Sequence, residues 1–187
     1  MKPLILVKHS LPEVEENVPA REWSLSAEGC ERAQRLAEIL KPYRPEVILS
    51  STEPKARETA KILGESLRLN FEVVDGLHEH DRSNSPYYSK EKFQALVQEL
   101  FKNPEALIFG TETASEALKR FCDSVGSVQE RYQDSAVLIV AHGTVISLYT
   151  SWLTGCDGYS LWQDLGLPSF VTLDLQSKTL LETVNLS

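Results

Sequence analysis

Two short, uninterrupted apolar runs constrain the fold of this chain more than any other feature. They are residues 4–7 (LILV) and 137–141 (VLIVA). Runs of this length without a polar residue are typical of strands that are covered on both faces, as in parallel sheets flanked by helices. Residues 47–49 and 71–74 are two further strand candidates. The sequence therefore predicts a buried, mostly parallel sheet.

Amphipathic segments of helix length alternate with these strands. The clearest follows Ser26, a good N-cap residue, and is stopped by Pro42. The predicted helices span residues 27–40, 53–67, 115–132 and 144–153, and a hairpin is predicted from residues 169–175 and 180–186. The alternation predicts an α/β fold, a three-layer sandwich in which a mostly parallel central sheet carries helices on both faces.

Residues 82–113 interrupt this alternation. A polar stretch rich in Ser, Pro and Tyr is followed by a helix with an apolar stripe. We expect an insertion or lid that folds over the sheet of a single domain spanning residues 1–187. Packing against the core is the ordinary role of such a stripe, and covering a bound substrate is the second.

Charge and cysteine content narrow the function classes. Lys and Arg number 19 against 27 Asp and Glu, a net charge of -8, which argues against a nucleic-acid partner. The three cysteines are widely spaced and form no CxxC motif, so we expect free thiols in a reducing compartment. The longest apolar runs are too short for a membrane span or a signal peptide. We therefore expect a cytoplasmic protein with no membrane partner.

Chemically active residues follow the predicted strands. The first strand ends in Lys8 and His9, and residues 137–141 lead directly to His142. Residues 50–51 (SS) lead into a helix whose first turns carry Lys55 and Arg57, and residues 77–82 read LHEHDR. Ligands bind beyond the carboxyl ends of the strands in open α/β sheets. These histidines and cations should therefore converge on one edge, where a phosphoryl group is the best-matched ligand.

Each of these residues has an ordinary explanation when it is taken alone. Arg57 could pair with a neighbouring glutamate on its helix, and Lys8 could face solvent. However, cations near a helix N-terminus oppose the helix dipole by about 0.3 kcal/mol or more each. That placement is favourable only if an anion lies in front of the helix, so the set as a whole indicates an anion site.

The motifs, in this order, resemble those of the histidine phosphatase superfamily, in its phosphoglycerate mutase-like branch (branch 1). The matching segments are residues 4–10 (LILVKHS), 25–29 (LSAEG), 50–60 (SSTEPKARETA), 77–79 (LHE) and 140–146 (VAHGTVI). Each segment taken alone is weak evidence for the family, but the ordered set in a strand–turn–helix context is specific to it. The resemblance covers most of the chain and implies a phosphoglycerate mutase-like fold.

The resemblance also implies the chemistry. His9 would be the nucleophile that becomes phosphohistidine, Glu79 the proton donor, and His142 a catalytic residue that also binds phosphoryl oxygens together with Arg57. Lys8 and Ser10, which flank His9, would complete the phosphate site. No cofactor or metal is implied, because side-chain cations supply the charge. The implied function is a phosphomonoester hydrolase acting on a small phosphorylated metabolite, with the oligomeric state left open.

Two departures from the family pattern leave a second function open. Lys8 stands where the family has arginine, and Ser10 stands where it has glycine. A lysine offers a point charge instead of a planar fork, which loosens phosphate binding. The second function is therefore that of a weakened or inactive member that binds a phosphorylated ligand without turnover; a mutase is less favoured than a hydrolase.

The segment at residues 78–81 admits more than one role. Asp81 could replace Glu79 as the acid, and His78, His80 and Asp81 could instead form the metal site of a hydrolase. The side chains that select the substrate should lie elsewhere, in residues 14–23 and 82–110. Within these two segments, the candidates to line the pocket are Trp23, Tyr87 and Tyr88.

Overall fold

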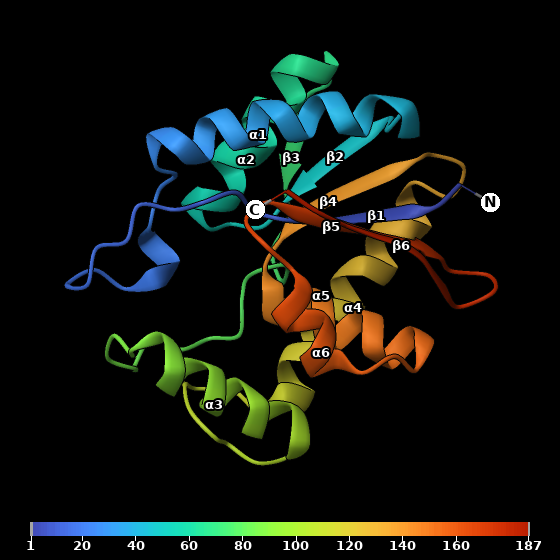
Figure 1. Cartoon of the computed structure of the whole chain (residues 1–187). Helices are drawn as coiled ribbons and strands as arrows, with labels where there is room; N and C mark the ends of the chain where they lie inside the picture. The colour runs from blue at the N-terminus through green and yellow to red at the C-terminus, as the bar shows by residue number, and fades with distance from the viewer. Residues whose placement is uncertain (1, 187) are drawn as a thin grey trace.

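The computed structural model describes residues 2–186, which form a six-stranded sheet in the order β3-β2-β4-β1-β5-β6 (Figure 1). The strands are β1 (Leu4–Lys8), β2 (Val47–Ser50), β3 (Phe71–Val73), β4 (Val137–Ala141), β5 (Ser169–Asp174) and β6 (Thr179–Asn185). The first four strands in chain order pair in parallel, whereas β5 runs antiparallel to β1 and to β6. The predicted mostly parallel sheet and the C-terminal hairpin are confirmed.

Helices cover both faces of the sheet, as predicted. They are α1 (Ala27–Leu40), α2 (Pro54–Leu67), α3 (Lys90–Lys102), α4 (Ala114–Arg131), α5 (Gly143–Thr154) and α6 (Gly158–Asp164), with short 3-10 helices η1 (Ala20–Glu22) and η2 (Lys41–Tyr43). In Figure 1, α1 and α2 lie on one side of the strands, and α4, α5 and α6 lie on the other. This arrangement is the expected three-layer α/β sandwich.

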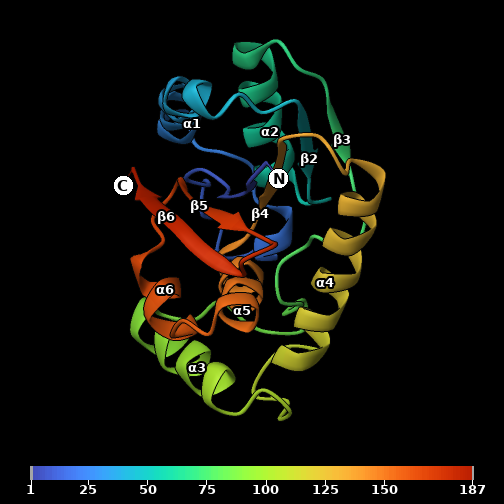
Figure 2. The same ribbon diagram turned by 90° about the vertical axis from the view of Figure 1, so that its right-hand side faces the viewer.

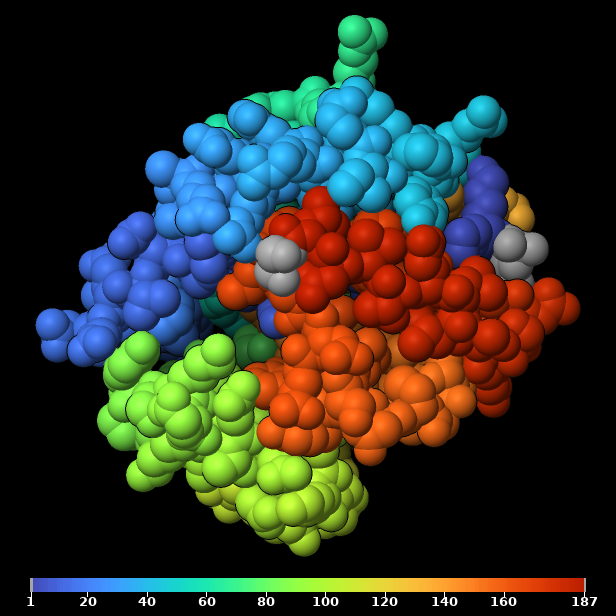
Figure 3. Space-filling model, in the orientation of Figure 1, coloured from blue at the N-terminus to red at the C-terminus, as the bar shows by residue number. Residues whose placement is uncertain are grey.

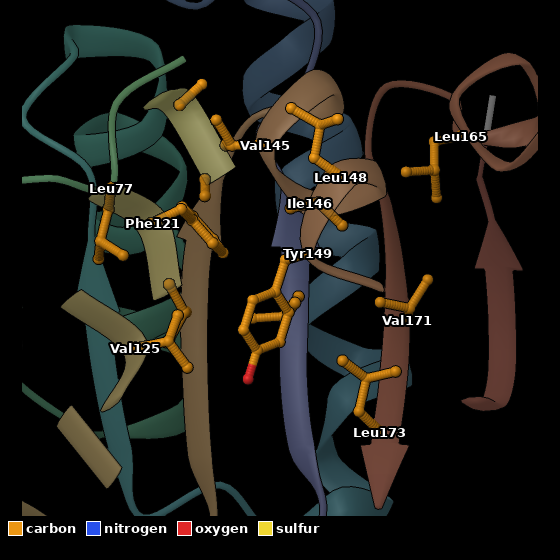
Figure 4. Packing of buried hydrophobic residues seen from close by; sticks show 14 of the residues in the cluster. Leu77, Phe121, Val125, Val145, Ile146, Leu148, Tyr149, Leu165, Val171 and Leu173 are labelled. Atoms are coloured by element: carbon orange, nitrogen blue, oxygen red, sulfur yellow. The ribbon is translucent and has the colours of Figure 1, made fainter. Parts of the chain in front are cut away.

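The apolar runs are buried on both sides because successive side chains of a strand point to opposite faces. Ile5 and Val7 of β1 belong to the core beneath α1 and α2, whereas Leu4 and Leu6 belong to the core beneath α4 and α5. Figure 4 shows the second of these cores, where Phe121 is among the side chains that lie over the sheet. Burial of residues 4–7 leaves the carboxyl end of β1 as the first place where a polar side chain can face a cavity.

The predicted helix boundaries are close to the observed ones. Helix α1 has the predicted bounds, and the Ser26 hydroxyl accepts a hydrogen bond from the Gly29 N–H. Helix α5 begins one residue earlier than expected, and Gly155 ends it in the left-handed conformation at φ 77°. Gly155 suits that conformation because it has no Cβ. Helix α6 was not predicted.

Residues 82–113 contain α3, which packs against α6 (Figure 2). Val97 and Leu100 of α3 are buried in the core, while Phe93 faces a cavity described below. Packing against the core is therefore confirmed for the apolar stripe of α3, and covering a bound substrate stays a prediction. The division of the chain into one domain with a lid stays a prediction. Among residues 2–186, no helix has the length and apolar character needed to cross a membrane.

Candidate active site

A cavity of about 660 Å³ opens at the carboxyl ends of β1 and β4 and at the start of α2. Its lining includes Lys8, His9, Lys55, Glu79 and His142. In Figure 3 the surface is hollowed where the segment before α1, the start of α3 and the C-terminal region meet. A volume of this size is typical of sites for small organic ligands.

His9 follows β1 directly and is buried in the cavity wall. Its Nδ1 lies 2.7 Å from the Ser10 carbonyl oxygen. A carbonyl can only accept, so Nδ1 carries the proton and Nε2 keeps its lone pair. Burial lowers the pKa of His9 well below 6.5, and the positive charge of Lys55 lowers it further. His9 is therefore a neutral imidazole with a nucleophilic Nε2 at pH 7.

His142 lies at the end of β4, where it is the N-cap residue of α5. Its ring is edge-to-face with that of His9, with 5.1 Å between the centroids. Its Nε2 is 2.8 Å from the Ser51 hydroxyl, and its buried Nδ1 has no partner among residues 2–186. Burial, followed by the charge of Lys55, lowers the pKa of His142 well below 6.5. The cavity thus holds two neutral, adjacent imidazoles.

Glu79 is held at the N-terminus of α5. Its carboxylate accepts hydrogen bonds from the backbone N–H groups of His80 at 2.8 Å, Thr144 at 3.1 Å and Val145 at 3.3 Å. A negative charge at this end of a helix is stabilised by the helix dipole. The helix that His142 begins therefore also fixes the position of the Glu79 carboxylate.

Arg120 of α4 fixes the loop that carries Glu79. Its guanidinium donates to the carbonyls of Gly76 at 2.6 Å, His78 at 3.0 Å and Glu79 at 3.2 Å. It also forms an ion pair with Glu112 at 2.6 Å. This role was not predicted from the sequence, because α4 lies far from the motifs in the chain.

Asp81, the second candidate for the acid, also lines the cavity. Its carboxylate accepts a hydrogen bond from the Ser83 N–H at 2.9 Å. The Glu79 carboxylate, by contrast, accepts hydrogen bonds at the N-terminus of α5, and its charge raises the pKa values of both Lys8 and His142. Of the two candidates for the acid, Glu79 is therefore the one that is held at the start of the helix that His142 begins.

Lys8 reaches the cavity from the last position of β1. Its Nζ donates to the Leu165 carbonyl at 2.7 Å. Its side chain passes over Gly143, where an added Cβ would lie 3.1 Å from Lys8 Cε. Burial lowers the pKa of Lys8 to about 8, although the charge of Glu79 raises it. Lys8 therefore carries its positive charge at pH 7 and loses it in mildly alkaline solution.

The structure does not bring Arg57 into the cavity. Arg57 is exposed on α2 and is not among the lining residues, whereas Lys55, two positions earlier, is buried and lines the cavity. Lys55 Nζ donates to the Ala20 carbonyl at 2.6 Å and forms an ion pair with Glu53. The expectation that Arg57 lies at the phosphate site is therefore wrong. Lys55 is the cation that α2 brings to the cavity.

Ser10 also lies outside the cavity lining. Its hydroxyl donates to the Gly29 carbonyl at 2.7 Å, and its N–H donates to the Thr59 hydroxyl at 3.0 Å. Gly29 allows Leu11, the next residue of the turn, to lie close to α1, since a Cβ at Gly29 would lie 2.0 Å from the Leu11 carbonyl oxygen. Ser10 thus ties the turn after β1 to α1 and α2, and its hydroxyl is not placed to bind a phosphoryl oxygen.

Glu53 is a cavity residue that was not predicted from the sequence. It is buried, and its Oε1 accepts the Glu79 N–H at 2.8 Å and lies 3.5 Å from His142 Nε2. A buried glutamate is unusual unless it is paired, and Lys55 supplies the pair. Its position immediately before Pro54, at the start of a helix and next to the Ser50-Ser51 turn, is the only sequence signal for it.

The metal-site hypothesis is not supported by this geometry. Among residues 2–186, no group of three or more His, Cys, Asp or Glu side chains is arranged to hold a metal. His80 is buried, its Nε2 donates to the Glu112 carbonyl at 2.7 Å, and its ring packs against Phe109. His78 lines the cavity. The two imidazoles therefore do not act as a pair.

The outer wall of the cavity is aromatic. Trp23 and Tyr87 line it, as considered from the sequence, whereas Tyr88 does not. Trp23 and Tyr87 lie 6.5 Å apart, which brings the segment before α1 next to the segment before α3. Phe93 and Trp162 form an edge-to-face pair at 5.8 Å. This wall can contact the organic part of a ligand whose phosphoryl group lies near His9.

Comparison with known families shows which family the chain belongs to. The family model described as the histidine phosphatase superfamily (branch 1) matches residues 4–183. The chain belongs to this superfamily. It is similar to the uncharacterized phosphatase PhoE of Bacillus subtilis, with 28% identity over 133 residues, 71% of this chain and 66% of the relative. The match thus spans just under two thirds of that relative's length.

Solved structures of several phosphatases share the fold. A phosphoserine phosphatase from Entamoeba histolytica, in complex with 3-phosphoglyceric acid, has a TM-score of 0.80 and 15% identity, covering 100% of this chain and 98% of its own. A mycobacterial glucosyl-3-phosphoglycerate phosphatase has a TM-score of 0.75 and 20% identity, and the match covers 91% of this chain and 89% of that protein. The α-ribazole phosphatase from Shigella flexneri has a TM-score of 0.72 and 21% identity, and the match covers 98% of this chain and 96% of that protein. At these identities the likeness shows the fold alone.

Proposed function

We propose that this protein is a phosphomonoester hydrolase that acts through a phosphohistidine on His9. The observation that carries the proposal is the fixed tautomer of His9. Its Nδ1–H donates to the Ser10 carbonyl at 2.7 Å, so Nε2 is free to attack phosphorus. The proposal extends to a small phosphorylated metabolite as substrate, to chemistry without a metal, and to a cytoplasmic setting.

In the first step, His9 Nε2 attacks the phosphorus atom while the bond from phosphorus to the leaving oxygen breaks. Glu79, in its protonated form, gives its proton to that oxygen, which departs as an alcohol. In the second step, the Glu79 carboxylate takes a proton from water, the resulting hydroxide attacks phosphorus, and the N–P bond breaks. Inorganic phosphate leaves, and both residues return to their starting states.

The remaining cavity residues stabilise the transferred group. Phosphoryl transfer spreads negative charge over three equatorial oxygens, and Lys8 and Lys55 supply positive charge beside His9. If the Ser51 hydroxyl donates to His142 Nε2, the unpartnered Nδ1 carries a hydrogen that can be donated to a phosphoryl oxygen. Such preorganised donors are a large part of catalysis because they need no reorganisation during the reaction.

Trapping the intermediate tests the proposal directly. Denaturing the protein during turnover of p-nitrophenyl phosphate labelled with radioactive phosphorus should leave phosphate on the protein. That phosphate should be labile in acid, stable in base, and located on the peptide that contains His9. A label stable in acid, or one on another residue, would contradict the proposed intermediate.

One observation favours a second candidate, a member that binds phosphorylated ligands without turnover. The cations nearest His9 already have partners, because Lys8 Nζ donates to the Leu165 carbonyl and Lys55 is paired with Glu53. The Leu165 carbonyl takes up an N–H donor of Lys8, and the Glu53 carboxylate offsets the charge of Lys55, so less of each is available to a transition state. Absence of hydrolysis across a broad phosphoester panel, together with tight binding of inorganic phosphate, would favour this candidate.

The lowered pKa of Lys8 predicts an alkaline limit to activity. The ammonium form, which attracts phosphate, is present below pH 8 and is lost above it, because the pKa is about 8. We expect kcat/KM, which reports the free enzyme, to fall roughly tenfold on passing through this range. A Lys8→Arg variant keeps its charge, so its profile should stay flat from about pH 7 to 9.5. Profiles with the same inflection for both proteins would exclude Lys8 as its source.

A further inference from the structure

Arg82 differs from the other cations that line the cavity. Its guanidinium lies over the Phe93 ring, 4.3 Å from the centroid. Within residues 2–186, it makes neither a hydrogen bond nor an ion pair of its own. By contrast, Lys55 is paired with Glu53, and Arg21 Nε lies 3.7 Å from Glu22. Arg82 therefore keeps its N–H donors available to a ligand.

The backbone around Arg82 is fixed in place. Its carbonyl accepts the Ser85 N–H at 2.9 Å, closing a turn. On the preceding residue, the Asp81 N–H donates to Glu112 Oε1 at 2.8 Å, and the Asp81 carbonyl accepts the Thr111 N–H at 2.8 Å. Because the segment and the Phe93 contact hold the side chain, a ligand that binds Arg82 orders little of the protein.

A guanidinium held in this way favours a planar anion. Its unpaired donors are costly when they are partly removed from water, and a ligand can relieve that cost. Burial lowers the pKa of Arg82, while Glu79 and Glu53 raise it, so carboxylates of the protein lie in its surroundings without pairing with it. The Phe93 ring packs against the guanidinium without pairing with its N–H groups, which leaves them for a bidentate contact.

We propose that Arg82 forms a second anion subsite, which selects phosphomonoesters whose leaving group carries a carboxylate. The inference rests on the proposed function, since it places the phosphoryl group of the same ligand beside His9. A carboxylate suits the subsite better than a second phosphate, because a dianion would be repelled more strongly by Glu53, Glu79 and Asp81. The cavity of about 660 Å³ has room for both ends of such a ligand.

Matched substrates test the subsite. O-phosphoserine and O-phosphoethanolamine differ by one carboxylate, and so do 3-phosphoglycerate and glycerol 3-phosphate, in which CH₂OH replaces it. We expect the wild-type protein to prefer the carboxylated member of each pair. Arg82→Gln should lower kcat/KM for that member by about 10- to 100-fold, the effect of losing a hydrogen-bonded charge, and change the other member by less than about threefold. Arg82→Lys keeps the charge without the planar fork, so its kcat/KM for the carboxylated member should lie between those of the wild-type protein and Arg82→Gln.

Arg35→Gln is the matched control, because Arg35 is an exposed arginine on α1 outside the cavity lining. This variant removes the same charge. In each of the two substrate pairs it should leave unchanged the ratio of kcat/KM for the carboxylated member to kcat/KM for the other. An equal loss for both members of each pair in Arg82→Gln would overturn the subsite, since it would show a general structural effect. A preference for fructose 1,6-bisphosphate over fructose 6-phosphate that depends on Arg82 would overturn the choice of a carboxylate.

Binding separates this inference from the proposed function. Calorimetric titration of His9→Ala with O-phosphoserine and O-phosphoethanolamine needs no turnover. A preference for O-phosphoserine that disappears in His9→Ala/Arg82→Gln would support the subsite even if no hydrolysis occurred. If His9→Ala bound both ligands equally, the subsite would be overturned even if the wild-type protein hydrolysed them.

Discussion

Replacing His9 with alanine should reduce kcat/KM for p-nitrophenyl phosphate by about 10⁴-fold or more, the effect of removing a covalent nucleophile. His9 is the cavity residue that combines burial, a pKa well below 6.5 and an Nε2 freed by the bond from Nδ1 to the Ser10 carbonyl. Water cannot replace it, because an imidazole is held in attacking position whereas a water molecule must first be activated. Initial rates across a range of substrate concentrations measure the loss.

His78→Ala is a matched control for this prediction. His78 lines the same cavity, but it is half-buried whereas His9 is buried, and it is not part of the edge-to-face pair that His9 forms with His142. We expect its kcat/KM to fall by no more than about tenfold, the range of a lost contact to a ligand. A loss in His9→Ala as small as that in His78→Ala would show that the reaction does not pass through His9.

The strand ends of this fold were predictable because burial leaves a strong trace in sequence. β1 and β4 are apolar along almost their whole length, so the first polar residues after them, His9 and His142, had to lie at the sheet edge. The parallel pairing of β1 with β4 then brings the two histidines together. Helix α6 escaped prediction because its seven residues are too few to show a helical period.

The prediction for Arg57 was wrong for a geometric reason that could have been recognised from the sequence. Two residues apart on a helix corresponds to roughly 200° around its axis, so Lys55 and Arg57 cannot face the same cavity. Lys55 lies four residues before Thr59 and eight before Leu63, both of which are buried. This spacing of four places Lys55 on the inner face of α2 and Arg57 on the outer one. The period of the helix was thus the signal for Lys55.

The positions of Glu79, Glu53 and Arg82 could not be read from the sequence in the same way. All three depend on loops whose course is set by distant residues, such as Arg120 of α4, which donates to the Glu79 carbonyl. Hydrogen bonds between segments that lie far apart in the chain leave no periodic pattern. The order of the motifs indicated Glu79, but only the fold shows that its carboxylate lies at the start of α5.

Replacing Glu79 with glutamine should separate the two chemical steps. Alkyl phosphates have a basic leaving oxygen, so loss of the proton donor should lower their kcat/KM by about 10²- to 10⁴-fold. Nitrophenolate leaves as a stable anion, so kcat/KM for p-nitrophenyl phosphate should fall by about tenfold or less. Its kcat should fall much further, because water attack on the phosphohistidine also needs the Glu79 carboxylate.

Rapid mixing of Glu79→Gln with p-nitrophenyl phosphate should therefore show a burst of nitrophenolate equal to the enzyme concentration, followed by slow turnover while phosphate accumulates on His9. Asp81→Asn is the matched control, because Asp81 lines the same cavity but its carboxylate is held by the Ser83 N–H and not by the N-terminus of α5. It should show no burst and should treat alkyl and aryl phosphates alike. If Asp81→Asn gave the burst and Glu79→Gln did not, the acid would be Asp81, and the hydrogen bonds at the start of α5 would serve only to hold Glu79 in place.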